Sequence, residues 1–381
     1  MMLEVTKYKV KYKDLDISEI AKRVTVFFDV YSPYYSARLE MLDSRGIEMA
    51  TGDIVSVYVE SSAVGKLEAR TAEIEFVVLQ SGKENSDGLR TRVYSVELIS
   101  SLAIRDHSKT ISADFSSKNA AEAVREIIAE TGYNVIAAVD SDEPISFKKI
   151  SSPVDLANRI LFSARFAGIR DALLIPTVKP MTMKLSSVSR MLGDNTGLKI
   201  KKALMTSGED PAAKYMSYIA MDTAFSDSSA NIVSGVTTDR STMTFDLLSK
   251  KSVVEEENWN SRTGRTNDAV NVRRYDTVYA SSTAASSEQN SRTSASTNFM
   301  DRLSVIMDNH SLRHFLTMHG HLFWLTDVFG KAVNFELTKQ DIDNTAIGNK
   351  GGDFILTSAA LTIERNTKSF INIELSRGHK Q

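Results

Sequence analysis

Four histidines near the end of the chain are the strongest candidates for chemistry. The set is His310, His314, His319 and His321, with Asp308 and Asp327 nearby. Zinc needs three or four convergent N, O or S ligands, and these types could supply them. However, we expect a helix-to-strand change between His310 and His314, which separates that pair. The pattern therefore favours ordinary strand and loop histidines, with a metal-dependent enzyme as an alternative that metal analysis of the purified protein would test.

A second candidate combines basic and aromatic residues in the stretch KRVTVFFDVYSPYY. Such residues on an OB-type barrel could bind single-stranded nucleic acid by base stacking, and salt-dependent binding to an oligonucleotide would reveal it. Strand aromatics are more often core residues, and tyrosine is favoured at protein interfaces. We therefore predict core and interface roles. The candidate protein-interface residues are Tyr31, Tyr34, Tyr35 and Trp259.

Composition and missing motifs argue against several other classes. The chain has no cysteine, which removes disulfides, thiolate catalysis and cysteine-ligated zinc. The sequence contains no G-x-S-x-G, H-E-x-x-H or Walker motif. A net charge of −2 argues against coating nucleic acid by bulk charge. Without a long apolar run or an apolar N-terminal signal, we expect no membrane span and no secretion by that route. We expect neither an enzyme nor a cofactor.

The elements that would position these residues begin with a β-rich segment. Residues 1–110 are predicted to form strands within 23–44, 51–61, 71–80 and 90–100, with a loop over 81–89. Short strands at close spacing are typical of a small barrel or sandwich.

Residues 111–197 indicate an α/β insert. One helix is predicted over 116–132, with Ser117 as its cap and Gly132 at its end. A second is predicted over 151–168, with Ser152 as the cap and Pro153 at the first helical position. Strands are expected over 133–139, 171–178 and 180–188. The insert lacks the glycine-rich turn that a nucleotide site needs.

The remainder is predicted to hold a second barrel interrupted by a polar insert. Residues 198–235 form its first part, 236–309 form the polar insert with a helix at its end, and 310–381 complete it. Low hydrophobic content over 226–298 predicts little contribution to the core, with part of the segment ordering only against a partner. The closing hairpin over 353–377 alternates apolar and polar residues, and Leu361 and Ile373 are expected to be buried.

An internal echo links the two β-rich segments. GDIVSVYVE, beginning at Gly52, is similar to GKAVNFELT, beginning at Gly330, and YSVEL at 94–98 is similar to INIEL at 371–375. Both blocks keep nearly the same spacing. The sequence therefore predicts an α+β protein with two similar small antiparallel β-barrels, separated by the α/β insert and the polar insert.

With this organisation, the chain resembles the baseplate hub proteins of contractile-tailed bacteriophages and the hub part of type VI secretion spike proteins. The segment NFMDRLSVIMDNHSLRHFLTMHGHLFWLTDVFGKAVNFELT carries the likeness best, although Phe329-Gly330 stands where the family often has Pro-Gly. The resemblance covers most of the chain as architecture, without a catalytic motif.

The resemblance implies a structural role in the virion, at the tail baseplate, after assembly in the host cytoplasm. Such hubs are homotrimers in which two barrels per chain make a ring of six, which adapts a sixfold tail tube to a threefold central spike. The implied partners are the spike protein, the tail tube or tube-initiator protein and the tape-measure protein, with no membrane. DNA would pass through the ring only as cargo during genome ejection.

Overall fold

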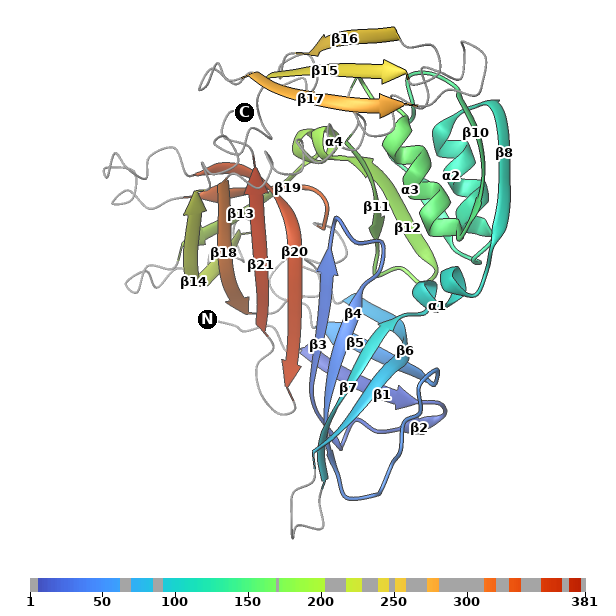
Figure 1. Ribbon diagram of the computed structural model, residues 1–381. Coiled ribbons are helices and arrows are strands. Elements are labelled where there is room, and N and C mark those ends of the chain that lie inside the picture. The colour runs from blue at the N-terminus through green and yellow to red at the C-terminus, as the bar shows by residue number, and fades with distance from the viewer. Residues whose placement is uncertain are drawn as a thin grey trace.

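The computed structural model describes residues 6–61, 70–84, 92–168, 171–202, 217–227, 239–246, 251–257, 273–280, 312–319, 329–336, 351–364 and 370–377. The described part is mostly β-structure with a few short helices, an α+β arrangement (Figure 1). No described helix is long and apolar enough to span a bilayer.

One large sheet joins the two ends of the chain. Its N-terminal strands are β1 (Thr6–Tyr12), β2 (Leu15–Asp16), β3 (Ala21–Asp29), β4 (Ser36–Asp43), β5 (Ile54–Ser61), β6 (Arg70–Glu84) and β7 (Arg92–Ser100). Its later strands are β13 (Asn195–Lys202), β14 (Ser217–Asp227), β18 (Leu312–His319), β19 (Ala332–Glu336), β20 (Gly352–Glu364) and β21 (Phe370–Arg377). The order is β19-β13-β14-β18-β21-β20-β3-β4-β7-β6-β5-β1-β2, with β19 also paired to β20.

Alternating side chains explain these strands. In β3, Val24, Val26 and Phe28 are buried, whereas the residues between them point to the other face. The closing hairpin behaves as predicted, because both Leu361 and Ile373 are buried. Buried residues of both halves form one continuous core.

The two halves have the same strand order, as the sequence echo predicts. The first runs β1-β5-β6-β7-β4-β3, and the second runs β13-β19-β20-β21-β18-β14. When the two-residue strand β2 is left out of the count, the strands taken along the sheet are in each case the first, fourth, fifth, sixth, third and second of that half. The halves therefore repeat one topology.

Irregularities in the two halves also coincide. The β6–β7 ladder skips Leu79, and the β20–β21 ladder skips Thr357 at the corresponding point. The β3–β4 ladder skips Lys22, and the β14–β18 ladder skips Met221. The further corresponding pairs are Gly52 and Gly330, Leu39 and Leu316, Met41 and Met318, and Val96 and Ile373. A bulge has a specific position within a strand. Two shared bulges therefore show that the two halves correspond residue by residue.

The halves differ in their first strands, and the expectation of wholly antiparallel pairing is wrong there. β1 pairs antiparallel with β5, whereas β13 pairs parallel with both β19 and β14. The physical reason is the route of the chain, since β13 enters the sheet directly after helix α4 (Val188–Gly193) instead of from a hairpin.

The strands of the second half form a complete circuit of backbone pairings, whereas the described strands of the first half do not. Because β19 pairs with both β13 and β20, the second group returns to its starting strand. Among the described strands, β1 pairs with β2 and β5 but not with β3. A side-chain contact connects β1 and β3 instead, since the Tyr8 hydroxyl donates to the Ala21 carbonyl at 2.7 Å.

The two halves meet where β3 pairs with β20. Their ladder runs from Asp29 opposite Ser358 to Arg23 opposite Glu364. Beyond it, the Val30 amide donates to the carbonyl of Thr357 at 2.9 Å. Figure 1 shows these strands side by side at the centre of the sheet.

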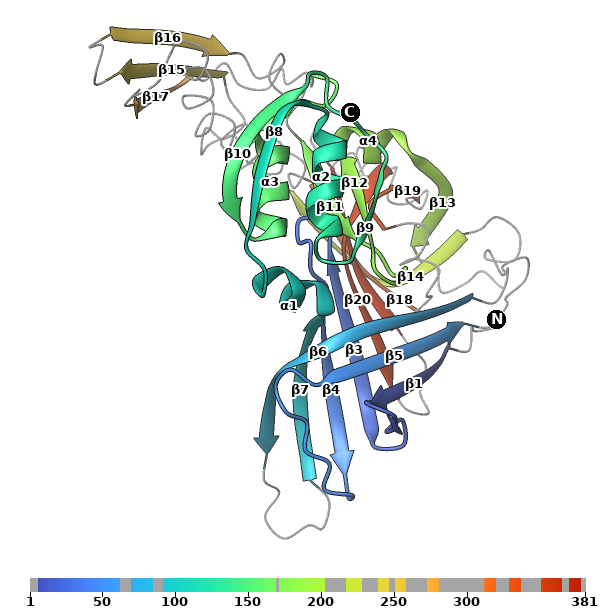
Figure 2. The same ribbon diagram turned by 90° about the vertical axis from the view of Figure 1, so that its right-hand side faces the viewer.

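The α/β insert has its own core. Its elements are β8 (Ile111–Lys118), α2 (Ala120–Ala129), β9 (Asn134–Ala137), β10 (Ile145–Ser151), α3 (Pro153–Ser163), β11 (Ala172–Pro176), β12 (Thr182–Ser187) and α4, preceded by α1 (Ser101–His107). Helices α2 and α3 pack together beside the insert's strands (Figure 2). Within the polar insert, β15 (Asp239–Asp246), β16 (Lys251–Glu257) and β17 (Arg273–Ala280) form a separate three-stranded sheet.

Two local expectations need correction. Residues 81–84 continue β6 instead of forming a loop, because they pair with β7. The cap of α2 is Asn119, whose side chain accepts from the Ala121 amide, since β8 continues to Lys118 and displaces Ser117 from that position. Ser152 is the N-cap of α3, as predicted, and Pro153 follows it in the first turn, although the Ser152 side chain makes no capping bond. The helix expected near residue 297 lies outside the described residues.

Candidate interaction surfaces

A groove of about 610 Å³ crosses the sheet where the two halves meet. Its lining comes from β3 and β20 at the junction, from β18 and β21 on one side, and from Ser32, Tyr34 and Ser36 at the β3–β4 connection. Phe27 and Phe315 line it with 42% and 38% of their surfaces exposed. Aromatic residues are enriched at protein interfaces, so these two exposed rings make the groove a candidate contact surface.

The same face carries charged groups that are paired across strands. Arg23 lies between Glu364, which accepts from Nε at 2.6 Å, and Glu40, at 3.6 Å. Arg38 pairs with Glu97 at 3.6 Å. Farther along, the Arg313 guanidinium lies 3.8 Å from Glu374. Opposite charges on neighbouring strands leave little net field on this face.

The predicted interface tyrosines make contacts within the chain. Tyr35 is half-buried, and its ring packs at a tilt against Phe28 and edge-to-face against Phe76, with ring centroids 5.5 and 5.4 Å away. Burial raises the pKa of its hydroxyl above the usual value. Tyr31 packs against the same core. These positions agree with the predicted core role, and an additional interface role stays a prediction. Trp259 lies outside the described residues.

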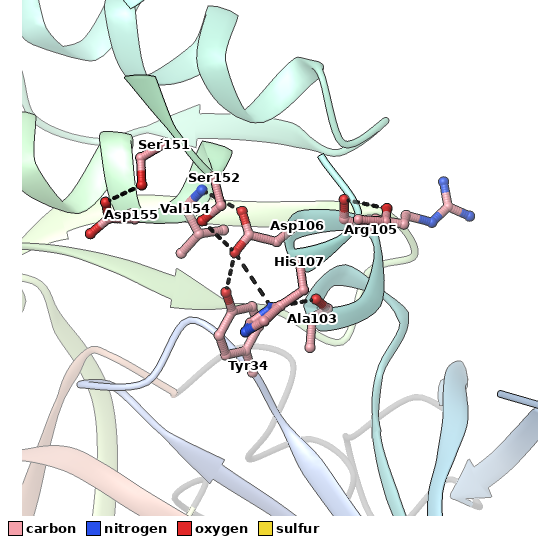
Figure 3. A network of polar contacts seen from close by, with 10 residues as sticks. Tyr34, Ala103, Arg105, Asp106, His107, Ser151, Ser152, Val154 and Asp155 are labelled. Carbon is pink, nitrogen blue, oxygen red and sulfur yellow. Dashed lines mark hydrogen bonds and ion pairs between the residues drawn. The ribbon is translucent and has the colours of Figure 1, made fainter. Parts of the chain in front are cut away.

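Tyr34 belongs to a buried polar network around Asp106 (Figure 3). Asp106, in α1, is 2% exposed. Its carboxylate accepts hydrogen bonds from the Tyr34 hydroxyl at 2.7 Å, from Ser152 Oγ at 3.1 Å and from the Val154 amide at 2.6 Å. Burial, and then the Asp106 carboxylate, raise the pKa of Tyr34.

This network attaches the insert to the first half. Tyr34 lies between β3 and β4, Asp106 follows β7, and Val154 is in the first turn of α3. Asp106 therefore supplies the cap that the Ser152 side chain does not make, and the three donors compensate its lost hydration. A lone Asp in a short helix gives no sequence signal for this role.

Of the four histidines, His314 has a clear structural role. It lies in β18, is 3% exposed, and packs between Phe335 and Phe354 with centroid distances of 4.4 and 4.9 Å. Its parity with Leu312, Leu316 and Met318 could have indicated burial. His319 ends β18, while His310 and His321 lie outside the described residues. Within the described part of the chain, no three His, Cys, Asp or Glu residues are placed to hold a metal.

A second hollow, of about 450 Å³, lies beside the turn before β5. Asp53 accepts from the Tyr12 hydroxyl at 2.5 Å and from the Ala50 amide at 3.0 Å, and these bonds lower its pKa to about 2. Tyr94 donates to the Ile47 carbonyl at 3.0 Å. These contacts hold the loop that connects β4 to β5 and explain the hollow as part of the fold.

Comparison with solved structures identifies the fold. A tail protein from Neisseria meningitidis MC58 superposes with a TM-score of 0.61 at 11% identity, over 98% of this chain and 96% of that one. A 43 kDa tail protein of prophage MuSo2 from Shewanella oneidensis gives 0.58 at 12% identity, over 97% of each chain.

A third similar structure is the E. coli c3393 protein, described as a type VI secretion component with structural similarity to bacteriophage T4 tail proteins gp27 and gp5. Its TM-score is 0.51 at 10% identity, over 98% of this chain and 79% of that one. No family model matches the sequence, and no curated protein matches it. The likeness confirms the expected resemblance at the level of the fold, which phage tail proteins and secretion components share.

Proposed function

We propose that this protein is the structural hub of a contractile phage-tail baseplate and acts without catalysis. The observation that carries the proposal is the repeated strand order with its two coincident bulges, in a fold shared along the whole chain with tail proteins. A chain with two equivalent units can present twice as many similar surfaces as there are copies.

In this proposal each half is one small barrel, within the divisions 1–110, 111–197, 198–235, 236–309 and 310–381. Three chains form a ring with six similar units. The units form a sixfold face for the tail tube or its initiator. The inserts occur once per chain, keep threefold symmetry and face the central spike.

The central hole would pass the tape-measure protein and then DNA. We expect the polar face of the sheet to line this hole, because β1 and β5 cover the opposite, apolar face of β3 and β4. Figure 2 shows β1 and β5 crossing in front of these strands. Its paired charges also suit the role, since a lining with little net field would not hold the genome.

The mass and shape of the purified protein test this function. We expect a particle of three 42.2 kDa chains by light scattering, and a ring with six similar lobes by electron microscopy. A compact monomer, at concentrations where a specific interface of standard size should hold, would contradict the proposal.

A further inference from the structure

Three basic side chains gather where the α/β insert meets the second half. Lys184 lies in β12, Arg190 lies in α4, and Lys331 lies in the turn before β19. Within the described part of the chain, none of their charged groups forms a hydrogen bond or an ion pair. The three cations therefore differ from the paired charges on the polar face of the large sheet.

Packing around Gly330 brings β12, α4 and this turn together. A Cβ on Gly330 would lie 3.1 Å from Ile175 Cδ1 and 4.0 Å from Met191 Sδ. Ile175 is directly opposite Lys184 in the β11–β12 ladder, and Met191 follows Arg190 in α4. The turn thus lies against a neighbour of each of the other two cations.

Backbone hydrogen bonds hold Lys331 at the same place. The Asp194 carbonyl, at the end of α4, accepts from the Ala332 amide at 3.2 Å. The Lys331 carbonyl accepts from the Leu356 amide at 3.3 Å. Helix α4 also contacts β12, β19 and β20, and Figure 1 shows it beside the upper ends of these strands.

The charges around Lys184 do not balance. Lys184 is half-buried, on the face of its sheet that points away from α2 and α3. Burial lowers the pKa of its ammonium group; among the neighbouring charges, Asp194 raises this pKa, whereas Lys331 and Arg190 lower it. Three positive groups against one carboxylate leave two positive charges without compensation. Such a cluster is unfavourable at a partly desolvated position unless it holds a counter-ion.

Solvent reaches Lys184 from the side of β9. Ile136 pairs with Lys184 in the parallel β9–β12 ladder and is 52% exposed. Strand β9 is also the last strand of its three-stranded sheet. An anion can therefore approach Lys184 along β9 without a change in the fold.

We propose that Lys184, Arg190 and Lys331 form a binding site for an oxyanion, either free phosphate or a carboxylate of an acidic protein segment. Ammonium and guanidinium groups donate charge-assisted hydrogen bonds to such oxygens, and the planar guanidinium can donate two in parallel. A bound oxyanion would join β12 to α4 and to the turn before β19. It would fasten the insert to the second half, as Asp106 fastens it to the first. The site does not require the proposed ring.

Thermal unfolding of the full chain tests the site. The first probe is inorganic phosphate, added at constant ionic strength with sodium chloride as the balancing salt. We expect a saturable rise in melting temperature, because an anion that binds only the folded state stabilises it. Poly-glutamate is the second probe. A response to phosphate alone identifies a small anion, and a stronger response to poly-glutamate identifies an acidic segment; either response supports the site.

Three variants locate the response. Lys184→Met removes the half-buried charge and keeps an apolar stem, so it should be at least as stable in chloride and should lose most of the response to both probes. Arg190→Gln, at an exposed position, should weaken the response several-fold. Lys148→Met is the control, since Lys148 is an exposed lysine of the insert that pairs with Asp114. It should keep the full response.

Chemical modification gives a second measurement on the natural chain. Phosphate should slow the acetylation of Lys184 by acetic anhydride, followed by mass spectrometry, and should leave the acetylation of Lys148 unchanged. Protection that is lost in Arg190→Gln supports a shared site.

Two results would overturn the site. One is an equal rise in melting temperature for the natural protein, Lys184→Met and Lys148→Met, which is a general salt effect. The other is the absence of a saturable response to either probe, whatever the oligomeric state. A compact monomer that binds phosphate through Lys184 would reject the proposed ring and leave the site standing.

Discussion

Gly52 and Gly330 occupy corresponding turns before β5 and β19, both with positive φ, but only Gly330 is closely surrounded. A Cβ at Gly52 would meet nothing within 4 Å, whereas one at Gly330 would lie 3.1 Å from Ile175 Cδ1. The insert packs against the turn of the second half at this point. The repeated turn therefore has different neighbours in its two places.

This difference predicts unequal costs for the same substitution. Gly52→Ala should destabilise the protein by about 1–2 kcal/mol, the usual cost of a left-handed conformation for a residue with a Cβ. Gly330→Ala should cost more, because Ile175 must also move. Urea denaturation of both variants measures the two values, and a Gly330→Ala protein as stable as Gly52→Ala would show that the contact with Ile175 relaxes freely.

The core of the second half depends on Ile373. It is 3% exposed and lies opposite Ala359 and Leu316. Ile373→Ala should lower the free energy of unfolding by about 2–5 kcal/mol. Ile373→Glu should lower it further, because a carboxylate would lose its hydration. Asn372→Ala, at the exposed neighbouring position, is the control; it removes one exposed hydrogen bond from the Thr317 hydroxyl and should cost much less. An unchanged melting temperature for Ile373→Glu would contradict the assigned strand face.

The Asp106 network predicts a sizeable effect from a small change. Tyr34→Phe removes one hydroxyl that donates to a buried carboxylate, and hydrogen bonds to charged groups contribute about 1.5–3 kcal/mol. We expect a loss of that size in chemical denaturation. Asp114→Asn is the control, since Asp114 pairs with Lys148 on exposed strands, where solvent screens ion pairs and they contribute little. Equal losses in the two variants would mean that the network does not fasten the insert.

Stability should fall at alkaline pH. Burial, reinforced by Asp43, raises the pKa of Tyr94 to about 12 from 10.0. Because the folded-state pKa is raised, the stabilisation is complete below pH 10 and is lost as pH rises toward 12, where the unfolded chain has released its proton. Tyr35, whose pKa burial also raises, acts in the same direction.

Replacement of Tyr94 by Phe tests whether this tyrosine causes the fall in stability at alkaline pH. At neutral pH the variant should have a free energy of unfolding lower by about 1 kcal/mol, because it lacks the hydrogen bond to the Ile47 carbonyl. Its unfolding free energy should then decline less steeply than that of the natural protein between pH 10 and 12. Parallel declines would show that other groups cause the alkaline loss.

Local patterns in the sequence were sufficient for most strands. Alternation located the closing hairpin, and the echo between YSVEL and INIEL identified β7 and β21 as counterparts. The turn-rich residues 81–84 misled the sequence interpretation, because pairing with β7 overrides their local preference. A polar composition at a strand end cannot show whether a neighbouring strand will pair there.

Contacts between segments far apart in the chain could not be predicted from local sequence patterns. Arg23 and Glu364 are 341 residues apart, and no periodicity signals that β3 and β20 will pair. The same holds for the groove, whose lining residues converge only when that junction forms. His314 is the opposite case, since its parity with buried neighbours was visible and the more noticeable histidine spacing obscured it.

The cap that Asp106 supplies to α3 limits how the insert could be exchanged between related proteins. Residues 111–197 look like a portable module, yet the first turn of α3 is completed by a carboxylate located before them. A chimaera that exchanged this module alone would combine one protein's Asp with another protein's helix. Successful recombination should therefore carry α1 with the insert, and divergence on either side of residue 111 should be correlated.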